Sequence, residues 1–215
     1  MSLPQTPITK NKDLIVINLF AGPGAGKSTV ASGLFHLMKL ANHDVELVTE
    51  FPKDLVYQQR WNMFYEQADI FTEQHHRQRR LVQYGVKYCV TDSPLLLCHM
   101  YISQDYYKNL LPLVDEAFNS FDNINIFLKR TKKYNPKGRN QTEDESLIID
   151  QKVIDLLFAQ TQKFYMVNGD HKAPKKILQI VDFLKNGGTI FDDDPMTYVD
   201  ASRVEKQFLI DLGIL

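Results

Sequence analysis

Short apolar runs alternate with longer amphipathic segments along most of the chain. Runs of the length of buried strands occupy residues 14–20, 45–49, 87–92, 124–129 and 163–167. Segments with a helical spacing of apolar residues follow them at 28–40, 53–84, 104–121, 147–159 and 174–184. This alternation predicts a three-layer α/β fold, in which a five-stranded, mostly parallel sheet carries helices on both faces. Ligands of such sheets bind at the carboxyl ends of the strands.

The alternation stops at two segments. Residues 130–146 are polar, basic at first and acidic at the end, and we expect them to form a lid. From residue 186 onward the chain holds an Asn-Gly-Gly run, three aspartates before a proline and a short helical pattern. We therefore predict a domain of residues 1–185 and a tail of residues 186–215. The tail packs on its own core, joins two copies as a homodimer or covers a basic groove.

Composition narrows the class of protein. The 215 residues are 44% hydrophobic and 24% charged, which suits one globular core, and the net charge of −1 demands neither nucleic acid nor an anionic membrane. Cys89 and Cys98 lie in or near apolar runs without metal-ligand spacing, which favours a reducing compartment. The first residues lack the apolar stretch of a signal peptide, and no apolar run approaches the ~20 residues of a membrane span. We expect a cytoplasmic protein with no membrane partner.

The strongest chemical signal is the stretch LFAGPGAGKSTVASGLF at residues 19–35. It fits the P-loop pattern G-x-x-x-x-G-K-[ST] except that Ala21 replaces the first glycine, and it joins a predicted strand to a predicted helix, as the motif requires. Backbone amides and the helix N-terminus hold phosphates there. We expect Lys27 to reach the β- and γ-phosphates of ATP and the Ser28 hydroxyl to help hold Mg²⁺. The expected nucleotide-binding residues are Gly22, Pro23, Gly24, Ala25, Gly26, Lys27, Ser28 and Thr29.

Two carboxylates end neighbouring predicted strands. Glu50 ends the second strand, in LVTEFPKDL, where it faces the same crevice as the P-loop and can take a proton from an attacking hydroxyl. Asp92 ends the third strand, in YCVTDSPLLL, where it suits a ligand of Mg²⁺ or of its water shell. A helix cap or surface charge for Glu50 and a turn residue for Asp92 are the structural alternatives.

The lid segment supplies positive charge. Arg130 and Arg139 are the arginines that we expect to stabilise charge on the transferring phosphoryl group, together with Lys132, Lys133 and Lys137. A solvated run of charges without a catalytic role is the alternative.

Residues 53–84 are expected to form a helical wall opposite the P-loop. Gln74 is the preferred reader of an acceptor base, because an amide matches a donor and acceptor edge. Arg77 belongs to the cluster HHRQRR at residues 75–80, which suits a nucleotide phosphate, a DNA backbone or simply a solvated helix face.

Taken together, GPGAGKST, Glu50-Phe51-Pro52, TDSP and the run Gly138-Arg139-Asn140 resemble the nucleoside and nucleotide kinase group of P-loop proteins. The chain is most similar to deoxynucleoside kinases, nicotinamide riboside kinases and kinase-like proteins of bacteriophages. The resemblance implies that Glu50 is the base for the acceptor hydroxyl and that Arg139 is a lid arginine. Those kinases place an arginine after the acid that ends the third strand, whereas this chain has Ser93.

The predicted function is an ATP-dependent kinase that transfers the γ-phosphate to a hydroxyl or phosphate of a nucleoside- or nucleotide-type acceptor. One alternative is a kinase acting on DNA, such as a phage kinase of 5-hydroxymethylpyrimidines in DNA. A second alternative is a P-loop NTPase switch or binding module.

Overall fold

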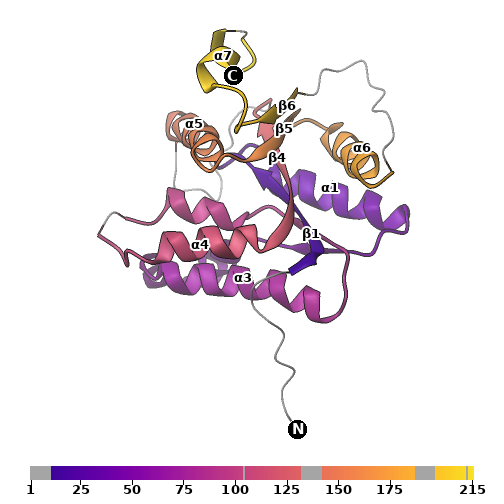
Figure 1. The fold of residues 1–215 in the computed structure, drawn as a ribbon. Helices are drawn as coiled ribbons and strands as arrows, with labels where there is room; N and C mark the ends of the chain where they lie inside the picture. The colour runs from indigo at the N-terminus through magenta and orange to yellow at the C-terminus, as the bar shows by residue number, and fades with distance from the viewer. Residues whose placement is uncertain (1–10, 104, 132–141, 187–196, 212) are drawn as a thin grey trace.

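The computed structural model describes residues 11–103, 105–131, 142–186, 197–211 and 213–215 (Figure 1). These residues form a six-stranded sheet of β1 (Asn11–Phe20), β2 (Val45–Val48), β3 (Tyr88–Thr91), β4 (Phe121–Lys129), β5 (Lys163–Asn168) and β6 (Thr197–Asp200). The spatial order is β2-β3-β1-β4-β5-β6, with β6 antiparallel to β5 and all other pairs parallel. The predicted α/β class and mostly parallel sheet are confirmed. The prediction of five strands missed β6, because its pairing with β5 joins segments far apart in the sequence.

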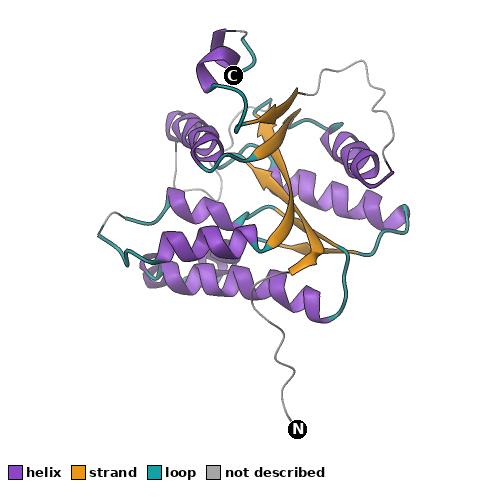
Figure 2. Ribbon diagram, viewed as in Figure 1, coloured by secondary structure: helices purple, strands orange, loops and turns teal. Residues whose placement is uncertain are grey.

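Helices cover both faces of the sheet (Figure 2). The helices α1 (Lys27–Leu40) and α6 (Ala173–Asn186) pack on one face, and α3 (Gln67–Gln83), α4 (Leu110–Asn119) and α5 (Glu143–Ala159) pack on the other. The short elements are α2 (Phe51–Tyr57), α7 (Lys206–Asp211) and two 3₁₀ helices, η1 (Trp61–Tyr65) and η2 (Leu95–Met100). In the described parts of the chain, no helix is long and apolar enough to cross a membrane.

The central strand β1 shows why the strand sequences are almost continuously apolar. Val16 and Phe20 pack among the residues of α3, α4 and α5, whereas Ile17 and Leu19 pack against α1 and α6. Successive side chains of a strand point to opposite faces, and both faces of this sheet are covered. Burial on both sides therefore replaces the alternating pattern of a half-exposed strand.

Three predicted helices differ from the structure. The helix expected at 147–159 begins at Glu143, within the segment expected to form a lid, because Thr142 and Glu145 form a capping box there. The expected helix at residues 53–84 is divided into α2, η1 and α3, because α2 ends before Gln59, whose φ of 56° lies outside the helical region. The expected helix at 104–121 begins only at Leu110, and Phe121 instead starts β4, where its buried ring joins the core.

The described part of the predicted tail packs on the core of its own domain. Val199 of β6 lies opposite Phe164 of β5, and Val199 and Leu209 are 1% and 6% exposed. Lys129 Nζ donates to the carbonyl of Ile214 at 3.0 Å, and Lys206 pairs with Asp155 of α5. The three tail aspartates, residues 192–194, lie outside the described residues.

A pair of neighbouring substitutions in α7 tests this packing. Leu209→Ala should lower the free energy of unfolding by about 2 kcal/mol, because it removes a buried side chain, whereas Phe208→Ala should change it by less than about 0.5 kcal/mol, since that ring is 57% exposed. Urea denaturation measures both. Equal, small effects would mean that α7 does not pack on the domain in solution.

Candidate active site

The P-loop runs from the end of β1 to the start of α1, at the carboxyl edge of the sheet. Gly26 precedes α1 with φ of +100°, a left-handed conformation that favours glycine. Ala21 is buried and does not have a positive φ, which explains why alanine fits where the motif usually has its first glycine. The departure from the motif therefore leaves the loop conformation intact.

The start of α1 presents open hydrogen-bond donors. The Val30 N–H bonds the Gly26 carbonyl at 3.0 Å, while the amides of Lys27, Ser28 and Thr29 have no acceptor in the described parts of the chain. The first amides of a helix lack internal partners and carry the positive end of the helix dipole. Ser28 and Thr29 are also exposed, so this end of the 14-residue helix can receive an anionic ligand.

Lys27 folds back over the loop that it follows. Its Nζ donates to the carbonyl oxygens of Ala21 at 2.8 Å and Gly22 at 3.1 Å. These neutral acceptors hold the ammonium group in place, and a phosphate oxygen is a stronger, charge-assisted acceptor for the same group.

Five charged groups surround the loop and influence one another. Burial lowers the pKa of Lys27, while Glu50, Asp92 and Asp150 oppose this by favouring the ammonium form and Arg130 adds to it. The sequence analysis predicted Lys27, Glu50, Asp92 and Arg130 as site residues, and the structure brings these four together. Asp150 was missed.

Glu50 lies at the end of β2 as the N-cap residue of α2. Its backbone N–H donates to Asp92 Oδ1 at 3.1 Å, which ties the end of β2 to the end of β3. Burial raises the pKa of the Glu50 carboxyl above its usual range, opposed by Lys27 and supported by Asp92. A carboxylate whose pKa is raised in this way is a better proton acceptor than an exposed glutamate.

Ser28 and Asp92 offer the oxygen chemistry that Mg²⁺ prefers. The residues that the structure describes contain no group of three His, Cys, Asp or Glu side chains suited to a metal ion. A magnesium ion that binds with a nucleotide needs only one or two protein ligands, since phosphate oxygens and water supply the others. The hydroxyl of Ser28 and the 4%-exposed carboxylate of Asp92 fit that requirement.

Arg130 and Asp150 form a largely but not fully buried pair, with side chains 10% and 14% exposed, that clasps the P-loop. Arg130 follows β4 and bonds Asp150 Oδ2 through Nε at 3.0 Å and the Pro23 carbonyl through Nη2 at 2.9 Å. Asp150 Oδ1 accepts the Gly22 N–H at 2.5 Å. Arg130 Nη1 is buried and has no partner among the described residues. No sequence signal separated Asp150 from the other acids of its helix.

The close packing of α5 explains the glycine at position 22. A Cβ at Gly22 would lie 2.7 Å from the Ser146 carbonyl oxygen and 2.9 Å from Asp150 Oδ1. Gly22 therefore lets α5 approach the loop, in addition to the role in nucleotide binding that its motif position predicts.

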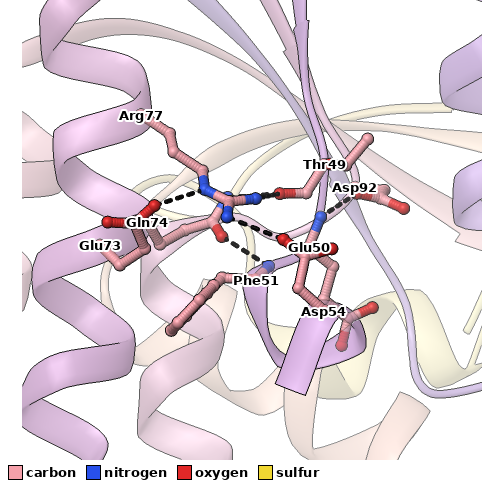
Figure 3. A network of polar contacts seen from close by, with 8 residues as sticks. All are labelled: Thr49, Glu50, Phe51, Asp54, Glu73, Gln74, Arg77 and Asp92. Carbon is pink, nitrogen blue, oxygen red and sulfur yellow. Dashed lines mark hydrogen bonds and ion pairs between the residues drawn. The ribbon is translucent and has the colours of Figure 1, made fainter. Parts of the chain in front are cut away.

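The two residues predicted to bind the acceptor, Gln74 and Arg77, lie on α3 beside Glu50 (Figure 3). Gln74 contacts the backbone of Thr49 and Phe51, and Arg77 pairs with carboxylates of α2 and α3. Both side chains are thus engaged by the protein itself, and their contact with an acceptor stays a prediction.

The HHRQRR cluster does not form a single basic face. His75 stacks on Phe71 and lies edge-on to Phe121, and burial lowers its pKa with help from Arg79 and His76. Gln78 is buried, whereas Arg80 is exposed. Arg139 and the lid lysines at 132, 133 and 137 lie outside the described residues.

The clasp on the P-loop makes a testable contribution to stability. Asp150→Ala should lower the free energy of unfolding by about 2 kcal/mol, because it leaves the largely buried Arg130 side chain without its carboxylate. Adding Arg130→Met should recover much of this loss. Asp155→Ala is the matched control, because Asp155 lies on α5 like Asp150. Its exposed pair with Lys206 of α7 is worth at most about 1 kcal/mol. Equal losses in urea denaturation for Asp150→Ala and Asp155→Ala would contradict a buried clasp.

Comparisons with known proteins agree with this architecture. A family model described as an AAA domain matches residues 16–173, and no curated protein matches the chain. Among solved structures, a NadR protein in complex with NR is similar with a TM-score of 0.61 and 14% identity, over 86% of this chain and 55% of the NadR chain. This chain thus spans little more than half of that neighbour's length, and the likeness concerns the fold. Because the family match includes the P-loop, Glu50 and Asp92 and covers most of the sequence, the chain belongs to the AAA domain family of P-loop proteins.

Proposed function

We propose that the protein is an ATP-dependent kinase that transfers a γ-phosphate to a hydroxyl or phosphate of a nucleoside- or nucleotide-type acceptor. The observation that carries this proposal is the position of Glu50. Its carboxylate shares the electrostatic environment of Lys27 and Asp92, and its pKa is raised by burial. A carboxylate in this environment can accept the proton that an attacking hydroxyl loses as its oxygen bonds to the γ-phosphorus.

The proposed step assigns a role to each group. Glu50 takes the proton of the acceptor hydroxyl while the acceptor oxygen bonds to the γ-phosphorus. The bond from that phosphorus to the β–γ bridging oxygen breaks, and ADP leaves. Lys27 and the amides at the start of α1 neutralise the β- and γ-phosphates. Ser28 and Asp92 would hold Mg²⁺, which would supply positive charge at the phosphates.

Arg130 and Arg139 are proposed to stabilise the charge on the transferring group. Arg130 is already oriented by Asp150 and the Pro23 carbonyl. A pre-oriented guanidinium stabilises developing charge without the cost of ordering a mobile side chain.

A small acceptor is favoured over DNA. The similar NadR structure holds NR, and this supports an acceptor of nucleoside type. Arg77 of the basic cluster, which the sequence analysis considered for a DNA backbone, is neutralised by Asp54 and Glu73. DNA binding depends on several unpaired cations along one surface.

Transfer of labelled γ-phosphate from ATP with Mg²⁺ tests the proposal directly. The acceptor panel contains nucleosides, mononucleotides, nicotinamide riboside and hydroxymethylated DNA. Glu50→Gln should reduce transfer by about 10²- to 10⁴-fold, the usual contribution of a general base. Glu46→Gln is the matched control, because Glu46 lies on the same strand in a surface pair with Lys39 and should leave transfer unchanged. Label released only as free phosphate, at equal rates in both variants, would replace the kinase with an NTPase.

The pH dependence provides a separate test. Glu50 acts as a base only when deprotonated, so kcat/KM should fall as the pH drops through its pKa, which burial raises above the usual range of a glutamate. This acidic limb should be present in the wild type and in Glu46→Gln, and absent from the residual activity of Glu50→Gln. An identical limb in all three proteins would assign it to another group.

A further inference from the structure

We infer that Gln74 is a positioning residue, whose amide holds the backbone on both sides of Glu50 and so orients the proposed base. This inference rests on the proposed function of Glu50 and gives Gln74 a role other than reading the acceptor. Its evidence lies in the contacts between α3 and the start of α2 (Figure 3).

The amide of Gln74 bridges the two peptide groups that flank Glu50. Its Oε1 accepts the Phe51 N–H at 3.1 Å, and its Nε2 donates toward the Thr49 carbonyl at 3.4 Å. The orientation of the amide follows from these partners, because a backbone N–H can only donate and a carbonyl can only accept. A carboxylate at position 74 could make the first contact but not the second.

These contacts also explain how the carboxylate of Glu50 stays available. Glu50 is the N-cap of α2, a position whose side chain commonly accepts a hydrogen bond from its own helix, yet it makes no such bond. Pro52, the second residue of α2, has no N–H for a capping side chain to accept, while Gln74 accepts the first helical N–H and Asp92 accepts the N–H of Glu50 itself. The Glu50 carboxylate is therefore not used as a helix cap and is left for chemistry.

Arg77, one turn further along α3, supports the same arrangement. Its guanidinium bonds Asp54 and Glu73, each at 2.8 Å, and lies 5.0 Å from the centre of the Phe51 ring. The contacts with Asp54 and Phe51 fasten the first turn of α2 to α3. Gln74 therefore bonds to a first turn of α2 that Arg77 already holds against α3.

The burial of Gln74 argues against direct contact with an acceptor base. The residue is 3% exposed, so almost none of its surface is open to a ligand. Each amide atom already has a backbone partner, and the low exposure leaves its remaining lone pair and N–H little access to a base.

Gln78 provides a matched control on the same helix. It is 1% exposed, and its Nε2 has no hydrogen-bond partner in the described parts of the chain. Gln74→Met and Gln78→Met thus make the same change at two buried sites, and only the first removes bonds to the backbone around Glu50.

Two measurements on these variants test the inference. Hydrogen exchange of the backbone amides, read residue by residue by NMR, should be faster at Phe51 in Gln74→Met and unchanged there in Gln78→Met. In the transfer assay, Gln74→Met should lower kcat about 10- to 100-fold, the effect of a small misplacement of a catalytic group. The acceptor KM and the preference among acceptor bases should stay as in the wild type.

Gln74→Glu extends the test if Gln74→Met fails to fold. The glutamate keeps an acceptor for the Phe51 N–H, so exchange there should remain slow. Unchanged exchange at Phe51 in Gln74→Met, fast exchange there in Gln74→Glu or an altered preference among bases would each overturn the inference. If the wild type transfers no phosphate, the proposed function fails, and exchange at Phe51 alone decides whether Gln74 holds this backbone.

Discussion

Parallel pairing of β1 on both of its sides is the constraint on which the site depends. Asn18 lies level with Thr91, the last residue of β3, and with Asn125 of β4, so the three parallel strands present their carboxyl ends on the same side of the sheet. The P-loop leaves β1 on that side of the sheet, beside Glu50 and Asp92, the acids that follow β2 and β3. The chemistry of the site is therefore assembled by strand register, and no single loop contains it.

Two separate sets of polar contacts hold the surroundings of the P-loop, one on each side of the site. The loop, the end of β4 and α5 are joined by the clasp of Arg130 and Asp150, while Lys27 uses backbone carbonyls of its own loop. On the opposite side, α3 holds the start of α2. The two sides differ in chemistry, since one uses the largely buried ion pair of Arg130 and Asp150 and the other a neutral amide supported by the more exposed ion pair of Arg77 and Asp54. Salt should weaken the pair of Arg77 and Asp54 more than the pair of Arg130 and Asp150, because the first is more exposed to solvent.

Features formed by residues that are neighbours in the sequence could be predicted from it. A strand, a glycine loop with Lys27 and a helix form one continuous stretch, and Glu50 could be placed in the crevice because it ends a strand. Features set by tertiary contact were not accessible in this way. Asp150 is one acid among several on an amphipathic helix, and its meeting with Gly22 depends on how α5 docks. Gln74 was noticed for its chemistry, but its partners are peptide groups, which are identical at every position of a sequence. The strand β6 is only four residues long and gains its identity from pairing with β5.

The lengths of the outer strands have a consequence for the behaviour of the protein at high concentration. Both edges of the sheet, β2 and β6, are four residues long, whereas the ten-residue β1 and nine-residue β4 lie inside. An exposed edge is a template for pairing with another chain, and a short one offers few backbone groups. By covering β5, the small strand β6 keeps the longer apolar strands away from intermolecular contact and so protects the folded chain against aggregation.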